Sequence, residues 1–340
     1  GGLRSWLASG VGAGRPRPPT GRQRDAAFRR ARGRWEKDGA ARSRAVAWII
    51  DAVVEGLERG PRAGQEVERR GFGELVVSHE ARHRRALHRE AVALERDLTR
   101  SGDGVPVAAT DAVGIVGAAA ALDLVAACAL TAGVTTLVLD PDPRALDEVR
   151  SGLRARWEGL AGEGGPSPRQ QERALARIRV PADRAARAAL PIAIDGDAGL
   201  FAARDAAALE ALVGERTVIA IPARATTVAA VASTAGVPSR WAGLRYLPAV
   251  GAGRLAEIVA GPRTEGGALA LAADLARRQG CTPVLVGDRP GGYGLRLLTA
   301  FVGEALHLLA DGAAVADVDA ALVEWGFASG PFALCDDLGW

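Results

Sequence analysis

The sequence predicts an α/β domain built on a parallel sheet, preceded by a helical linker and followed by an all-α domain. Three observations indicate this fold class. A strand–helix–strand pattern runs from Ala112 to Leu139, and apolar residues recur at three- and four-residue spacing from Arg44 to Leu57. From Gly291 onward the pattern is helical throughout. At 340 residues the chain is long enough for two domains and a linker.

The N-terminal region is predicted to be irregular over residues 1–42 and to form the helical linker over 43–108. Three prolines between Arg15 and Thr20 oppose regular structure. Gly60-Pro61 is expected to end the first helix, because this dipeptide interrupts a helical pattern. The predicted helices of the linker are Arg44–Leu57, Gln65–Leu75 and His79–Arg100.

The α/β domain is predicted over 109–288 and the all-α domain over 289–340. Gly117 is expected to end the first strand, and Asp140 the second, which is rich in β-branched residues. A strand, a helix and a second strand in this order imply a right-handed crossover and a parallel sheet. The predicted strands are 112–116, 134–139, 190–194, 217–221, 243–247 and 284–287, and the predicted helices are 118–131, 296–309 and 315–325.

Composition and charge exclude several classes of function. The formal net charge of +3 is too small to indicate a nucleic-acid partner. No apolar stretch reaches the roughly 18 residues of a membrane-spanning helix, so no span is expected. The three cysteines are scattered without a Cys-x-x-Cys pair. They indicate a reducing compartment such as the cytoplasm, and neither a disulfide set nor a metal site.

The four histidines do not form an evident catalytic or metal site in the sequence. His79 and His83 lie one helical turn apart, a spacing that could hold a metal, but no third ligand is near. Their segment is charged throughout, so a solvated helix face explains them better, and His88 continues that face. His307 is interpreted as a core or edge residue of its helix. No metal ligand is predicted.

The turn after the first strand has the position of a dinucleotide-binding turn but little of its composition. A Rossmann turn has the pattern Gly-x-Gly-x-x-Gly, which permits a tight turn, close approach of the pyrophosphate and close helix packing. Here only Gly117 remains. Ala119 places a methyl group where the phosphate would lie, and Leu122 places a large side chain between helix and strand. The sequence therefore predicts a Rossmann-type domain with weak or absent dinucleotide binding.

Asp140, at the end of the second strand, has two interpretations. An acidic residue at this place hydrogen-bonds the ribose of a bound dinucleotide. Asp-Pro-Asp-Pro (140–143) is also a strong turn sequence, in which Asp140 would only cap the turn. The sequence leaves both interpretations open.

Four segments in the last third of the chain carry a resemblance. They are Gly-Leu-Arg-Tyr-Leu-Pro-Ala-Val (243–250), Leu-Ala-Glu-Ile-Val-Ala-Gly (255–261), Asp-Arg-Pro-Gly-Gly-Tyr-Gly-Leu-Arg (288–296) and Gly-Phe-Ala-Ser-Gly-Pro-Phe-Ala-Leu-Cys-Asp-Asp-Leu-Gly (326–339). In order and spacing they resemble signature blocks of the 3-hydroxyacyl-CoA dehydrogenase family, and the resemblance extends over roughly residues 44–340. It implies a Rossmann-type NAD-binding domain, an all-α dehydrogenase C-terminal domain, and NAD-dependent oxidation of a 3-hydroxyacyl-CoA to the 3-oxo form.

Two segments of the linker add to this resemblance. They read Ile-Ile-Asp-Ala-Val-Val-Glu-Gly-Leu (49–57) and Glu-Arg-Arg-Gly-Phe-Gly-Glu-Leu (68–75). Both are similar to the linker of the multifunctional fatty-acid β-oxidation protein, which joins an upstream enoyl-CoA hydratase domain to the dehydrogenase. The resemblance implies a fragment that follows a hydratase domain and whose C-terminal domain is incomplete. It also implies an acyl-CoA substrate and a possible thiolase subunit as partner.

The resemblance places the catalytic pair of the family on Arg245 and Glu257. In the family a histidine removes the hydroxyl proton while hydride passes to the nicotinamide, and a glutamate orients the imidazole. Aligned without a gap, the histidine position holds Arg245 and the glutamate position holds Glu257. Because arginine stays protonated near neutral pH, it cannot accept a proton. We expect it to pair with Glu257 in a charge-assisted contact.

Other positions that the family uses hold different residue types here. The segment that contacts substrate and cofactor corresponds to 221–224 and ends in Arg224. The asparagine of the Gly-Phe-x-x-Asn-Arg motif corresponds to Leu295, while its arginine is kept as Arg296. An acidic position that faces the nicotinamide corresponds to Asp197. The resemblance thus implies a degenerate active site.

Three functions are open at this point. The first is a working NAD-dependent dehydrogenase with unusual residues. The second is a degenerate dehydrogenase module of a multifunctional β-oxidation protein, which serves as a scaffold or holds acyl-CoA while activity lies in the hydratase part. The third is a binding role independent of NAD. The substitutions favour the second.

Overall fold

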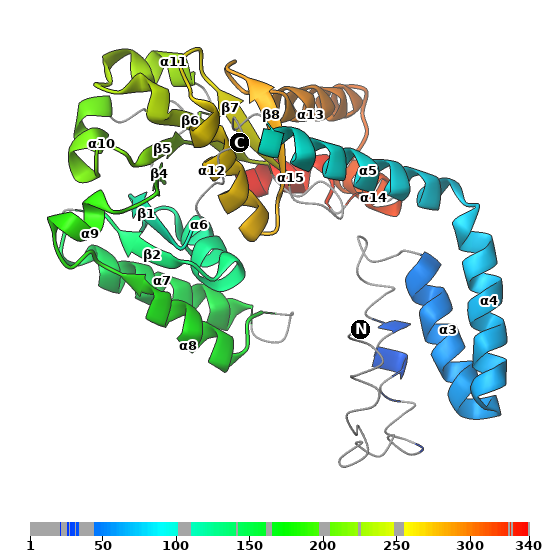
Figure 1. The fold of residues 1–340 in the computed structure, drawn as a ribbon. Helices are drawn as coiled ribbons and strands as arrows, with labels where there is room; N and C mark the ends of the chain where they lie inside the picture. Colours follow the sequence, from blue (N-terminus) through cyan, green and yellow to red (C-terminus); the bar gives the residue numbers. More distant parts are fainter. Residues whose placement is uncertain are drawn as a thin grey trace. The chain divides into compact units, whose positions relative to one another are not determined.

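The structure is a computed structural model that describes residues 21, 26, 28–30, 32, 33, 44–100, 110–140, 142–160, 165–196, 205–223, 226–247, 255–325, 327 and 329–338. Contacts divide the chain into two compact units, whose elements are labelled in Figure 1. The first unit comprises Gly1–Arg85 and Leu322–Ala328, and the second comprises Ala86–Ala321 and Ser329–Trp340. The irregular segment predicted over 1–42 lies almost wholly outside the described residues.

Two helices pack side by side in the first unit, α3 (Arg44–Arg59) and α4 (Pro61–Val76) (Figure 1). Gly60 joins them with a φ of 97°, in the left-handed region that favours glycine. The helix expected from Gln65 begins instead at Pro61, because the fixed φ of proline suits the first position of a helix. The third predicted helix, α5 (His79–Arg100), has the bounds that the sequence indicates.

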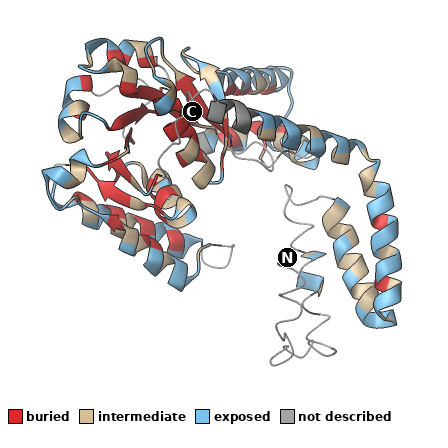
Figure 2. Ribbon diagram, in the orientation of Figure 1, coloured by how far each residue is buried: buried red, intermediate tan, exposed pale blue. Residues whose placement is uncertain are grey.

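Small residues let the α3 and α4 backbones approach closely. A Cβ atom at Gly64 would lie 2.7 Å from the carbonyl oxygen of Ala52, and one at Gly71 would lie 2.6 Å from Cδ2 of Trp48. These two glycines are the buried residues of α4 (Figure 2). The linker predicted by its apolar spacing is therefore a packed helical hairpin.

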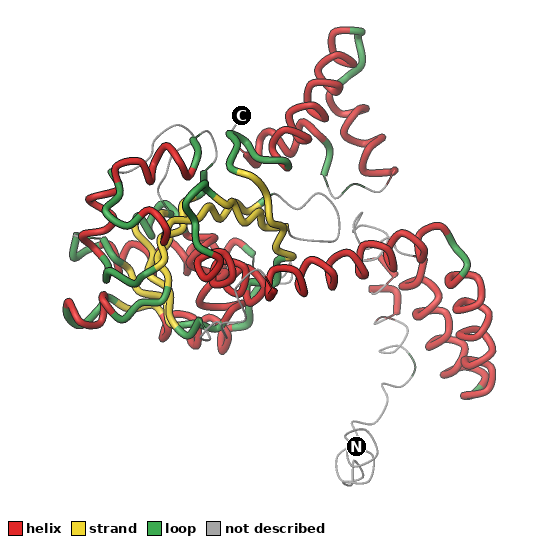
Figure 3. Tube along the Cα trace, turned by 45° about the horizontal axis from the view of Figure 1, so that its top comes forward, coloured by secondary structure: helices red, strands yellow, loops and turns green. Residues whose placement is uncertain are grey.

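The second unit contains one eight-stranded sheet with the strand order β3-β2-β1-β4-β5-β6-β7-β8. Its strands are drawn in yellow in Figure 3. All neighbouring strands are parallel except β6 and β7, which are antiparallel. The central strands β4 and β5 are buried along their whole length, which is typical of a sheet covered on both faces. The strands are β1 (Ala112–Val116), β2 (Thr135–Val138), β3 (Ile178–Arg179), β4 (Ile192–Asp195), β5 (Val218–Ile221), β6 (Trp241–Tyr246), β7 (Leu255–Ala260) and β8 (Thr282–Gly287).

Helices cover both faces of the sheet. One buried cluster joins the sheet to α7 and α12, and the other joins it to α10 and α11. Strand β1 shows the alternation, because Ile115 belongs to the first cluster and Val116 to the second. Helix α14 (Val315–Trp325) spans the division between the units. The other helices of this unit are α6 (Leu122–Ala126), the π-helix η2 (Ala127–Ala132), α7 (Ala145–Gly159), α8 (Pro168–Arg177), α9 (Arg184–Ala188), α10 (Ala206–Leu212), α11 (Val228–Val231), the 3₁₀ helices η3 (Ala232–Thr234) and η4 (Pro238–Arg240), α12 (Gly266–Arg278), α13 (Gly294–Ala310) and α15 (Pro331–Leu338).

The α/β fold class and the helices that follow it are confirmed, but the helices α7 to α12 were not predicted and three other elements differ locally. The helix expected at Ala118 begins at Leu122, because residues 118–121 form turns closed by backbone hydrogen bonds to Gly117 and Ala118. The two-residue strand β3 is too short to leave an alternating pattern. Strand β7 differs from the prediction because it carries Glu257, a charged residue at a buried position next to the edge strand β8.

Among the described residues, no helix combines the length and the apolar composition that a membrane-spanning helix needs. Within the same part of the chain, no group of three or more His, Cys, Asp or Glu side chains is placed to hold a metal ion. His79 and His83 therefore have no third ligand among the described residues.

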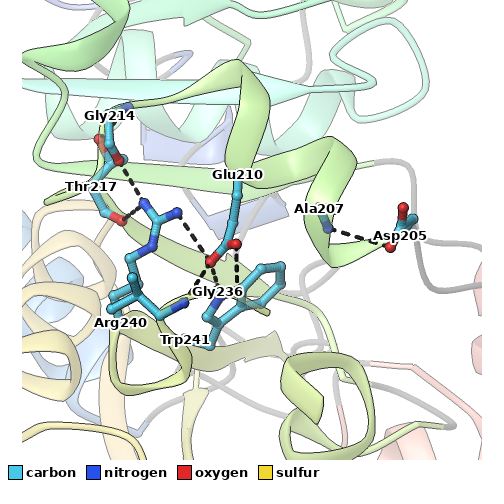
Figure 4. A network of polar contacts seen from close by, with 9 residues as sticks. Asp205, Ala207, Glu210, Gly214, Thr217, Gly236, Arg240 and Trp241 are labelled. Carbon is cyan, nitrogen blue, oxygen red and sulfur yellow. Dashed lines mark hydrogen bonds and ion pairs between the residues drawn. The ribbon is translucent and has the colours of Figure 1, made fainter. Parts of the chain in front are cut away.

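Glu210 on α10 anchors the loop before β6 (Figure 4). Its carboxylate accepts hydrogen bonds from the backbone N–H of Gly236 at 2.8 Å and from Trp241 Nε1 at 3.2 Å. It also forms an ion pair with Arg240, whose guanidinium donates to the carbonyl oxygen of Thr217 at 3.1 Å. Burial acts to raise the pKa of Glu210, but the hydrogen bonds outweigh it, so the pKa lies below its ordinary value.

The lowered pKa of Glu210 makes its contribution to stability pH-dependent. A carboxyl group with a lower pKa in the folded state stabilises the fold above its unfolded pKa, and this contribution is lost as the pH falls through the folded pKa. We expect Glu210→Gln to lower the free energy of unfolding at pH 7, and the difference from the parent to shrink below about pH 4. Urea unfolding across this pH range measures it, with the exposed Glu215→Gln as control. A pH-independent difference would contradict it.

Candidate active site

Arg245 and Glu257 face each other on neighbouring strands. They occupy directly opposed positions on the antiparallel strands β6 and β7. Their side chains are only 1% and 2% exposed, so this is a fully buried pair. Arg245 Nη1 donates to Glu257 Oε2, and the ion pair predicted from the sequence is present.

The pair also binds backbone groups from two further elements. Nε and Nη2 of Arg245 both donate to the carbonyl oxygen of Ala223, which follows β5, with Nε at 3.1 Å. The second carboxylate oxygen of Glu257, Oε1, accepts from the N–H of Tyr293 at 3.0 Å and of Gly294 at 2.6 Å. These N–H groups lie at the start of α13 and lack partners within the helix. The pair thus ties the ends of β5, β6 and β7 to the first helix after the sheet.

The backbone of Gly292 closes over this pair. A Cβ atom at Gly292 would overlap both the Arg245 guanidinium and the Glu257 carboxylate. Gly292 also has a φ of 53°, which side chains disfavour. Ala223, whose carbonyl oxygen receives Arg245, has a φ of 42°, so a non-glycine residue is held there in the left-handed region.

Asp140 turns its carboxylate toward the turn after β1. Oδ1 accepts from the N–H of Gly117 at 2.7 Å, and Oδ2 accepts from the N–H of Ala118 at 3.1 Å. Gly117 takes a φ of 68°, as a tight turn requires. Asp140 thus binds the turn after β1, whereas the side chain that caps the Asp-Pro-Asp-Pro turn is Asp142, which accepts from the N–H of Arg144 at 2.8 Å. Binding of Asp140 to a ribose stays a prediction.

Side chains fill the space around this turn. The side chain of Leu122 lies against α7, where a Cβ atom at Gly152 would be 2.7 Å from its Cδ1. The Cβ atom of Ala121 lies close to Gly196: a Cβ atom added at Gly196 would be only 2.6 Å from it. Ala119 is exposed at the tip of the turn. Leu122 therefore packs toward a neighbouring helix, at the start of α6.

Of the three remaining predicted substrate and cofactor positions, the structure describes one, Leu295. Leu295 is partly buried in the first turn of α13. Asp197 and Arg224 lie outside the described residues. The sequence missed Ala223, Tyr293 and Gly294, because they contribute backbone groups that carry no residue signature. The paired glycines at 291 and 292 were the one available signal.

Two further buried side chains of this unit, Tyr246 and Cys128, are not suited to act as a base. Tyr246 donates from its hydroxyl to Oε1 of Gln279 at 2.6 Å, and Nε2 of Gln279 lies 3.0 Å from Sγ of Cys128. Burial raises the pKa of Cys128 to about 12 and raises the pKa of Tyr246 well above its ordinary value. Both groups stay protonated near neutral pH.

Comparison with known proteins agrees with this architecture. Residues 112–289 match the family model described as 3-hydroxyacyl-CoA dehydrogenase, NAD binding domain, and residues 291–340 match that of its C-terminal domain. Among solved structures, the (S)-3-hydroxybutyryl-CoA dehydrogenase PaaH1 from Ralstonia eutropha is 24% identical with a TM-score of 0.57, over 67% of this chain and 82% of that one. The 3-hydroxybutyryl-CoA dehydrogenase from Escherichia coli K12 is 25% identical with a TM-score of 0.54, over 67% of this chain and 49% of that one. The chain therefore belongs to the 3-hydroxyacyl-CoA dehydrogenase family, for which NAD is the expected cofactor.

Proposed function

We propose that this chain is a 3-hydroxyacyl-CoA dehydrogenase module of fatty-acid β-oxidation that has lost its oxidoreductase activity. Its role is that of a scaffold or an acyl-CoA-binding module. The observation that carries the proposal is the buried ion pair of Arg245 and Glu257, which stands where the resemblance places the catalytic histidine and its orienting glutamate.

The pair cannot accept the hydroxyl proton of a substrate. Arg245 is a cation without a lone pair to offer, and its guanidinium donates to Glu257 and to the carbonyl oxygen of Ala223. Glu257 is a carboxylate, but both of its oxygens already accept hydrogen bonds. Protonation of Glu257 would leave the Arg245 guanidinium buried without its counter-charge, which costs ~3–5 kcal/mol. The pair is therefore a stable structural unit and a poor base.

The nucleotide turn does not fit a bound dinucleotide well. The pyrophosphate of a dinucleotide needs free backbone N–H groups and a close approach to the turn. In this chain Asp140 already accepts from the N–H groups of Gly117 and Ala118. The methyl group of Ala119 adds bulk at the exposed tip of the turn, where the pyrophosphate would approach. On this ground we propose that NAD takes no part in chemistry on this chain.

The helical linker supports a proposal about the larger protein that contains this module. The helical hairpin of α3 and α4 contains the two segments that resemble the linker of the multifunctional β-oxidation protein. On this ground we propose that an enoyl-CoA hydratase domain precedes the module in a cytoplasmic protein and supplies the enzymatic activity. A thiolase subunit is the corresponding candidate partner.

NADH binding provides the direct test. We expect a fluorescence titration with NADH to show no saturation in the low-micromolar range, because Asp140 occupies the turn and Ala119 and Leu122 replace glycines. The double variant Ala119→Gly, Leu122→Gly should bind NADH more tightly than the parent, whereas Ala185→Gly in the distant helix α9 should not. Low-micromolar affinity of the unmodified chain would refute the proposal for the nucleotide site.

A further inference from the structure

A second feature of the sheet lies beside the ion pair and shares Glu257 with it. A cavity of about 340 Å³ opens between β7, β8 and the start of α13. This volume is near the small end of the range of ~300–1,000 Å³ that is typical of ligand pockets. Every residue that lines it belongs to the second unit. The cavity therefore has the size for a small molecule.

The wall of the cavity is mainly apolar, for a reason found in the strand register. Glu257 on β7 pairs with Val284 on β8, and side chains two positions apart point to the same face. Val284 and Val286 therefore share the face of Leu255, and Leu247 joins them from the end of β6. Leu255 is 42% exposed at this place. An apolar ligand would cover surface that is now open to water.

The charges at the mouth of the cavity are positive. Arg289 and Arg296 line it with exposed side chains, and neither guanidinium has an ion pair or hydrogen bond among the described residues. The one carboxylate in the lining, Glu257, is neutralised by Arg245 and receives two backbone N–H groups. An arriving anion would thus meet two cations that have no partner, and no free carboxylate, among the described residues of the lining.

We propose that this cavity binds a small amphiphilic carboxylate, with its apolar tail against Leu247, Val284 and Val286 and its carboxylate on Arg289 and Arg296. The planar guanidinium presents paired N–H donors that match a carboxylate, and the apolar wall gains from covering a tail of a few methylene groups. The proposal is independent of the loss of oxidoreductase activity. A working enzyme could carry the same pocket.

Calorimetric titration of the full chain tests the proposal with three probes. Octanoate carries both the tail and the charge, octanol carries only the tail, and acetate carries only the charge. We expect octanoate to bind at one site, and octanol and acetate to bind at least about tenfold more weakly, which corresponds to about 1.4 kcal/mol for each missing part. Equal affinity for octanol and octanoate, or no octanoate binding at millimolar concentration, would overturn the proposal.

Variants locate the site. Arg289→Gln with Arg296→Gln should reduce octanoate binding to the octanol level without changing the thermal midpoint, because both side chains are exposed. Val286→Trp should fill the cavity and remove binding of both probes. Arg169→Gln on α8 removes another exposed arginine and should change nothing. Octanoate binding that survives the double arginine variant would refute the assignment. Adenosine bisphosphate serves as a phosphate probe. If the parent chain binds it but not octanoate, and the double arginine variant does not bind it, the arginines form a phosphate site and the proposal is overturned.

Discussion

No NADH is expected to form when this chain is incubated with NAD and a 3-hydroxyacyl-CoA. Loss of a general base alone typically costs ~10²–10⁴-fold in rate. The altered nucleotide turn, with Asp140 bound to Gly117 and Ala118, adds to that loss. Absorbance of NADH at high protein concentration measures the result, with an active member of the family as positive control. Robust turnover by the unmodified chain would refute the loss of activity.

Arg245→His separates the two causes of this expected inactivity. The substitution restores the base, and Glu257 is already placed on the opposite strand to orient an imidazole. We expect no recovery, because the nucleotide turn is altered as well and because the carbonyl oxygen of Ala223 would lose its donors. Activity is expected to require at least the further changes Ala119→Gly and Leu122→Gly. Recovery with Arg245→His alone would mean that the nucleotide turn still works.

Breaking the buried ion pair is expected to destabilise the second unit severely. Arg245→Ala or Glu257→Ala leaves a buried charge without its partner, which typically costs ~3–5 kcal/mol. Glu257→Ala also removes the acceptor for the N–H groups of Tyr293 and Gly294 at the start of α13, a capping loss of about 1 kcal/mol. Denaturant unfolding followed by tryptophan fluorescence measures the change in free energy.

A surface ion pair and a double apolar variant serve as comparisons for that unfolding experiment. The surface pair Arg59–Glu55 has the same residue types at 2.8 Å, with 74% and 28% of the side chains exposed, and its loss should cost at most ~0.5 kcal/mol. The double variant Arg245→Met, Glu257→Leu should be more stable than either single alanine variant, since no charge is then left unpaired. A cost below about 1 kcal/mol for both single variants would show that the pair does not stabilise the junction of β5, β6 and β7 with α13 as inferred.

The periodic elements of this fold could be predicted from the sequence because their signals are local. The helices at 44–59 and 79–100 follow from apolar spacing and from the breaker at Gly60-Pro61, and the βαβ unit follows from two apolar strands around a helix. Strand β7 could not be predicted in the same way. Its central residue is Glu257, whose charge is tolerated in a buried strand only because Arg245 lies directly opposite on β6. That opposition depends on residues twelve positions apart in the chain.

The sequence by itself determined the family pattern, the missing histidine and the charge of its replacement, because these depend only on which residue type stands at which position. The tertiary structure decided what the retained acidic residues do. Asp140 accepts from Gly117 and Ala118, and Glu257 accepts from Tyr293 and Gly294. The donors are backbone N–H groups, which every residue except proline carries, so no residue pattern marks them. Only the folding of distant segments against each other brings such groups within hydrogen-bonding distance of a particular carboxylate.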